Sequence, residues 1–111
     1  MNSTPQFHRE HNQLIVSLTG AMTFRDYATA DELLAKISDQ LKPDGTVPAV
    51  TALVFDLSAV TMIDSHWLGL FVRALKRAEE AAIAVIIRGA QPAVRRLLDL
   101  VQFERVFRIE A

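Results

Sequence analysis

Two kinds of apolar pattern alternate along this chain, and their order restricts it to one class of fold. Residues 52–57 (ALVFDL) and 83–87 (IAVII) are short apolar runs of the kind that forms buried strands. Between them the apolar residues recur at the spacing of one helical face, which predicts a helix over residues 65–80. Its predicted inward positions are Leu68, Phe71, Val72 and Leu75. A helix between two strands predicts an α/β fold, and the right-handed crossover rule predicts that these strands pair in parallel.

The N-terminal half repeats this alternation. Residues 14–18 form another apolar, β-branched run, and residues 6–9 are placed to pair with it. From Asp26 onward the spacing becomes helical. The residues predicted on the buried face of this helix are Ala30, Leu33, Leu34, Ile37 and Leu41. Residues 42–51 (KPDGTVPAVT) contain two prolines and a glycine, which predicts a loop before the next strand.

A third helix and an edge strand are predicted at the C-terminal end. Pro92 suits the first turn of a helix. The residues predicted to face inward from this helix are Val94, Leu97, Leu98 and Val101. Residues 106–109 are apolar enough to add an edge strand. With 111 residues, 50% of them hydrophobic, the chain has enough apolar material for one core. We therefore expect a single domain over residues 1–111, with a sheet of four to five strands and helices packed on it.

Composition excludes several classes of partner and compartment. Twelve Lys and Arg residues against thirteen Asp and Glu give a net charge of -1, and no long block of like charge is present, so we expect no nucleic-acid partner. The chain has no cysteine, which excludes disulfides and thiolate sites and fits a reducing compartment. Neither a signal peptide nor a run of roughly 20 apolar residues is present. We expect a soluble, cytoplasmic protein that does not insert into membranes.

Catalytic patterns are also missing from the sequence. His8, His11 and His66 are not accompanied by the acidic or histidine ligands that a metal site needs. The four glycines do not form a phosphate-binding loop. Asp64, Ser65 and His66 are neighbours in sequence, so their side chains diverge at a helix start and do not form a nucleophile with its base. We expect a protein that is not an enzyme and that has no cofactor and no metal.

One segment carries a recognisable motif. Asp56-Leu57-Ser58 ends the apolar strand run, and residues 63–69 (IDSHWLG) open the following helix. This arrangement resembles the STAS domains of anti-sigma-factor antagonists, in which a D-L-S-like run is followed by a hydrophobic residue and D-S-[ST]-G-L-G. Residues 14–27 (LIVSLTGAMTFRDY) resemble the opening strand and turn of a STAS subgroup with G-x-x-T-F-x-D. Residues 92–109 resemble the family's third helix and closing strand.

The resemblance implies a fold and a mechanism. It implies the STAS fold, a mixed β-sheet with helices packed on it. It also implies that the serine after the aspartate, Ser65, is phosphorylated by a partner kinase, usually an anti-sigma factor, and that phosphorylation weakens the complex. A phosphatase would be a further partner. The residues expected to contact the partner are Asp56, Asp64, Ser65, His66, Trp67 and Leu68.

Several alternatives remain open at this stage. Asp64 or Ser65 could serve only as a helix cap, because Asp and Ser are both favoured there. His66 and Trp67 stand where the family usually has Ser or Thr and then Gly. Trp67 could pack in the core or act as an exposed binding anchor, whereas His66 is expected to be solvated. The domain could also be a constitutive interaction subunit without phosphorylation, like the STAS proteins that accompany lipid-transport ATPases.

Asp56 has one further interpretation. An aspartate at the carboxyl end of a central strand is also the phosphorylated residue of a response-regulator receiver domain. A receiver would carry an acidic pair after its first strand and a lysine after its last conserved strand. This chain has Thr19-Gly20-Ala21 and Arg88-Gly89-Ala90 at those places, so the magnesium ligands are missing. The sequence therefore favours the serine over the aspartate as the regulated residue.

Overall fold

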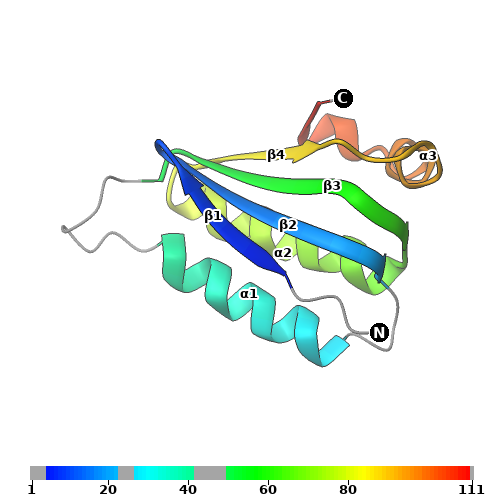
Figure 1. Cartoon of the computed structure of the whole chain (residues 1–111). Helices are drawn as coiled ribbons and strands as arrows, with labels where there is room; N and C mark the ends of the chain where they lie inside the picture. The colour runs from blue at the N-terminus through cyan, green and yellow to red at the C-terminus, as the bar shows by residue number, and fades with distance from the viewer. Residues whose placement is uncertain (1–4, 23–26, 42–49, 111) are drawn as a thin grey trace.

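The described strands form one mixed sheet. The computed structural model describes residues 5–22, 27–41 and 50–110, without the side chains of residues 27–30. The strands within these residues are β1 (Gln6–Glu10), β2 (Gln13–Met22), β3 (Ala52–Ile63), β4 (Ala84–Arg88) and β5 (Arg108–Glu110). They are joined in the order β1-β2-β3-β4-β5 (Figure 1). β1 pairs with β2 antiparallel, and all other pairs are parallel. The predicted α/β class, the mixed sheet and the parallel pairing of β3 with β4 are confirmed.

The helices supply the other half of the core. They are α1 (Tyr27–Leu41), α2 (Ser65–Glu80) and α3 (Pro92–Leu100), followed by a 3₁₀ turn, η2 (Phe103–Arg105). α1 and α2 lie side by side on the same face of the sheet (Figure 1). Their buried side chains join those of α3 and of the strands in one hydrophobic cluster. The rings of Phe55 and Phe71 lie 4.7 Å apart between centroids and connect β3 to α2 at its centre.

The opposite face of the sheet is built differently. Because side chains alternate along a strand, the neighbours of the core-facing residues point to the other side. Four of them, Ile15, Ala52, Val54 and Ile86, form a second small buried cluster. Only strand residues belong to this second cluster. The main core and α2, the helix that the candidate motif opens, therefore lie on one side of the sheet.

β3 is longer than the sequence predicted. The apolar run ends at Leu57, yet the strand continues to Ile63 because it pairs with the second half of β2, from Thr19 to Met22. The register of β2 against β3 shifts twice along this extension. Gly20 lies at φ +79°, a conformation that glycine adopts without steric cost. The shifts break strict alternation and leave Val60 and Ile63 buried, so the sequence reads as a loop although it forms a strand.

The C-terminal predictions need two corrections. α3 ends at Leu100, and Val101 is exposed instead of facing inward. The edge strand is β5 over residues 108–110, not 106–109. Val106 is exposed, whereas the ring of Phe107 packs 4.7 Å from that of Phe103. The chain joins the sheet after this aromatic contact, from Arg108 onward.

Some predictions fall outside the described residues. Positions 42–49 of the predicted loop lie there, as does the predicted helix start at Asp26. The side chain of Ala30 is also outside. The other predicted inward residues of α1 are buried: Leu33, Leu34, Ile37 and Leu41.

Candidate functional site

Asp64 begins α2. Its backbone is extended, with φ -110° and ψ 178°, as an N-cap residue requires. Its Oδ1 accepts hydrogen bonds from the backbone N–H groups of His66 at 3.1 Å and Trp67 at 3.2 Å. The backbone N–H of Asp64 donates to the carbonyl oxygen of Met22 at 3.0 Å, which ties the cap to the end of β2. Of the two capping candidates, Asp64 is therefore the residue that caps α2.

Ser65 is the first residue of α2 and is exposed. Asp64 provides the cap, so folding of the helix start does not use the serine hydroxyl. Met62 and Gly69 are among the exposed residues within four positions of Ser65 in the chain. Met62, near the end of β3, is 55% exposed, and it is one of four large apolar residues that are exposed in the described ranges, with Leu100, Val101 and Val106. Gly69 lies one helical turn beyond Ser65 and is also exposed. We call Met62, Ser65 and Gly69 the switch surface.

The residues that depart from the family motif turn inward. Trp67 is 0% exposed and Leu68 is 8% exposed, and both belong to the main core. Trp67 therefore takes the core position of its two alternatives, and its side chain does not reach a partner in this structure. His66 is half-buried and its Nε2 atom is buried, which corrects the expectation of a solvated histidine. Of the residues expected to contact a partner, only Ser65 is fully exposed next to this cap.

Asp56 lies apart from this group. It is in the middle of β3, where it pairs with Ser17 and Arg88, and it precedes Asp64 by eight positions, with seven residues of the strand between them. At about 3.3 Å per residue this corresponds to roughly 26 Å along the chain. Its neighbours Phe55 and Leu57 point into the main core, so Asp56 points to the opposite face of the sheet. The expectation that Asp56 ends its strand is wrong, and the structure does not bring it to Ser65.

Asp56 instead has a local set of partners. Its Oδ1 accepts hydrogen bonds from the Ser58 hydroxyl at 2.7 Å and the Ser58 backbone N–H at 3.0 Å. Its Oδ2 lies 3.7 Å from Nη2 of Arg88 on β4. Partial burial raises the pKa of Asp56, but the two Ser58 hydrogen bonds and the Arg88 charge together outweigh it and lower this pKa. Gln91 donates to the Ser58 carbonyl oxygen at 2.9 Å and connects this group to the start of α3.

Among the described residues, no three His, Cys, Asp or Glu side chains are close enough to hold a metal ion. Across those same ranges, no helix combines the length and the apolar character needed to cross a membrane.

Sequence reasoning missed Met62. The segment AVTMI gives no periodic signal for which of its residues faces out, because the irregular pairing with β2 decides this. The exposure of Met62 follows from tertiary structure alone. Gly69 was visible as a motif residue, but its place on the solvent side of α2 depends on which face of the helix is buried.

Comparison with known proteins identifies the fold and the family. The family model of the STAS domain matches residues 4–111. An anti-sigma factor antagonist from Mycobacterium paratuberculosis superimposes with a TM-score of 0.77 at 21% identity, covering 98% of this chain and 86% of that one. SpoIIAA in its unphosphorylated form gives a TM-score of 0.76 at 18% identity, covering 97% and 89%. The same Bacillus protein in its phosphorylated form gives 0.70 at 17% identity, covering 97% and 92%.

A transporter-related protein shares the fold as well. A sulfate transporter family protein from Wolinella succinogenes gives a TM-score of 0.68 at 12% identity, covering 91% of this chain and 78% of that one. At 12% sequence identity the superposition shows a shared fold and nothing more. The fold is therefore found both in antagonists of anti-sigma factors and in a transporter family.

Proposed function

The chain belongs to the STAS domain family, and from that premise we propose that it is a regulatory binding protein whose partner is released when Ser65 is phosphorylated. The partner proposed is an anti-sigma factor with serine kinase activity, and a phosphatase would reverse the modification. We propose that this exchange takes place in the cytoplasm and that the chain itself catalyses no reaction.

The observation that supports this proposal is the division of roles at the start of α2. Asp64 caps the helix and Trp67 fills the core, while Ser65 between them is exposed and has no part in the cap. A kinase could therefore reach the hydroxyl without unfolding the helix. Met62, three residues before Ser65, is exposed and offers an apolar side chain of the kind that the core of a protein interface contains.

Electrostatics favour a switch of binding over a switch of folding. A phosphoryl group adds about -1.5 to -2 charges at neutral pH. At the first position of α2 this charge meets the positive end of the helix dipole, which stabilises it. A partner that covers Met62 and Ser65 would have to bury the same charge without a counterion, which is costly. The fold should therefore tolerate the modification while the complex does not.

The two departures from the family motif do not obstruct Ser65. A histidine and a tryptophan in place of Ser or Thr and Gly would add bulk if they pointed outward. Trp67 is buried and His66 is half-buried, so the bulk is taken up by the core. This supports an accessible serine despite the altered sequence.

A second candidate function keeps the fold and omits phosphorylation. The chain would then be a constitutive interaction subunit of a transporter or signalling complex. The observation in its favour is the structural likeness to a sulfate transporter family protein. The substituted motif residues His66 and Trp67 are consistent with it, because a constitutive interface does not need the family's kinase recognition sequence.

Partner affinity of charge variants separates these two candidates. We expect Ser65→Asp to keep the fold and to lower the affinity for the native partner at least tenfold, while Ser65→Ala binds like wild type. Ala93→Asp is the matched control, because it adds the same charge to an exposed position in the first turn of α3. Equal affinity of Ser65→Asp and Ala93→Asp would favour the constitutive subunit.

A further inference from the structure

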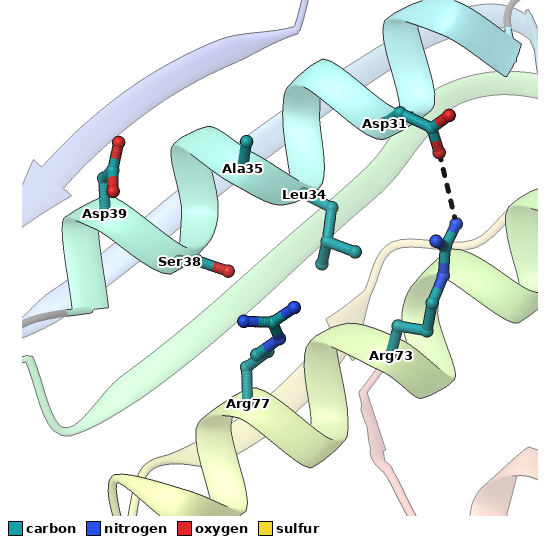
Figure 2. Close-up of a pocket in the computed structure, with 7 residues that line it drawn as sticks. All are labelled: Asp31, Leu34, Ala35, Ser38, Asp39, Arg73 and Arg77. Atoms are coloured by element: carbon teal, nitrogen blue, oxygen red, sulfur yellow. Dashed lines mark hydrogen bonds and ion pairs between the residues drawn. The ribbon is translucent and has the colours of Figure 1, made fainter.

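An open groove runs between α1 and α2 (Figure 2). Its volume is about 440 Å³. Apolar and small side chains of α1 line its centre, acidic residues lie along the α1 side, and two arginines lie along the α2 side. The lining residues are Asp31, Leu34, Ala35, Ser38, Asp39, Arg73 and Arg77.

The two arginines of the groove differ in their partners. Nη2 of Arg73 lies 3.5 Å from Oδ1 of Asp31, which joins the two helices. Arg77 makes no ion pair within 4.0 Å with any residue of the described ranges. Figure 2 shows its guanidinium directed from α2 toward α1, on the side of Ser38 and Leu34. Arg77 therefore presents an available positive charge inside a partly apolar groove.

The groove and two residues of the switch surface, Ser65 and Gly69, share helix α2. Ser65, Gly69, Arg73 and Arg77 follow one another at intervals of four residues on α2 and are all exposed. Residues four apart are neighbours on a helix surface. At 1.5 Å per residue, Arg73 lies about 12 Å and Arg77 about 18 Å along the axis from Ser65. A partner that covers the start of α2 could therefore reach the groove along one exposed stripe.

The charges along the groove indicate which charges a partner segment must carry to fit it. The α2 wall of the groove carries Arg73 and Arg77, with the exposed Lys76 between them in sequence and the exposed Glu79 and Glu80 at the end of the helix, whereas the α1 wall carries Asp31 and Asp39. A uniformly acidic segment would be repelled by α1. A segment that carries a carboxylate toward α2 and none toward α1 avoids repulsion by the aspartates of α1. Its carboxylate can pair with a guanidinium of α2 through two parallel hydrogen bonds.

We propose that this groove is a second contact for the protein partner and holds a partner segment whose carboxylate pairs with Arg77. The inference rests on the proposed function and specifies the chemistry of the partner. The switch surface would provide the regulated contact, and the groove would provide a contact that phosphorylation of Ser65 does not alter. An apolar side chain of the same segment would lie over Leu34 and Ala35.

Site-specific photo-crosslinking in the protein's own cells tests where the partner lies. A photo-reactive amino acid replaces Met62, Arg77 or Arg96 in the full chain. Arg96 is an exposed arginine of α3 and serves as the control. We expect the same partner to be cross-linked from positions 62 and 77 and not from 96, with Asp or Glu in the segment attached to position 77. A cross-link from 62 without one from 77 overturns the inference and leaves the proposed function standing.

Affinity of charge-reversal variants then tests the carboxylate, using the partner identified from the position 62 cross-link in purified form. We expect Arg77→Glu to lower its affinity about tenfold or more, with a smaller salt dependence, because an attractive pair becomes repulsive. Arg96→Glu should bind like wild type. Equal affinities of the two variants overturn the inference. Failure of the proposed function has a different signature, which is either no cross-link from position 62 or, with the cross-linked partner in hand, an affinity of Ser65→Asp equal to that of wild type.

Discussion

The Oδ1 atom of Asp64 accepts a hydrogen bond from the backbone N–H of Trp67 at 3.2 Å. This bond fixes the start of α2 and also holds in place a residue whose side chain is fully buried. Stability at this corner of the molecule therefore depends on the two residues on either side of the Ser65-His66 pair. Ser65 itself is left exposed, and the predictions below follow from this separation.

Asp64 should contribute to the free energy of unfolding, and Ser65 should not. Asp64→Ala removes the acceptor of two backbone N–H groups, so we expect it to lower the free energy of unfolding by about 1 kcal/mol. Ser65→Ala should change the free energy of unfolding by less than about 0.5 kcal/mol. Urea unfolding followed by the fluorescence of the single tryptophan measures both variants. A similar loss in the two variants would mean that Ser65 shares the capping role.

Trp67 should behave as a core residue and Met62 as a surface residue. Trp67→Ala leaves a large cavity, so we expect a loss of about 3–5 kcal/mol in the free energy of unfolding. Met62→Ala should cost little stability but should lower partner affinity by several-fold, as truncation of an interface residue does. Thermal unfolding and isothermal titration with the purified partner measure the two quantities. A Trp67→Ala protein that is stable but has lost its partner affinity would contradict the core assignment and would indicate that Trp67 contacts the partner.

The helices and the pairing of the two central apolar strands were readable from the sequence because their apolar residues follow clear patterns. The start of α2 at Ser65 and the parallel pairing of β3 with β4 are cases of this kind. The extension of β3 to Ile63 was not readable, because register shifts against β2 hide its alternation.

The candidate site was predictable only in part. The motif located Asp64 and Ser65 at a helix start, but local sequence does not decide whether an aromatic residue in the first turn points inward. That depends on the sheet beneath it, which left the position of Trp67 open. The exposure of Met62 and the groove at Arg77 arise from the packing of distant segments and have no local signal.

Gly69 should show opposite effects on stability and binding. A Cβ at this helical position would meet nothing within 4 Å, so Gly69→Ala should raise the free energy of unfolding by up to about 1 kcal/mol through helix propensity. The added methyl group lies on the switch surface and should weaken partner binding. Gly89→Ala is a contrasting control that should be destabilising. Gly89 has a φ of +75°, and the Cβ that alanine adds there would lie 3.2 Å from Cβ of Ser58. If Gly69→Ala binds the partner with unchanged affinity, Gly69 is not part of the interface.

Asp56 should make stability depend on acid pH. The folded state lowers the pKa of Asp56, because the Ser58 hydrogen bonds and Arg88 together outweigh the effect of burial. The resulting stabilisation is present above the unfolded pKa of about 3.9 and is lost as the pH falls through the lower folded value. The difference in free energy of unfolding between wild type and Asp56→Asn should therefore shrink from pH 7 toward pH 3. Urea unfolding across this range tests it, and a difference that grows in acid would contradict the assignment.

The central claim is that phosphorylation of Ser65 releases the partner. Phosphopeptide mass spectrometry tests it most directly, on protein isolated from its own cells and separated into partner-bound and free fractions, with the peptide containing Ser65 covered in both. We predict phosphate on Ser65 in the free fraction and none in the bound fraction. Phosphate distributed equally between the two fractions, or absent from Ser65 in both under growth and stress, would contradict the account.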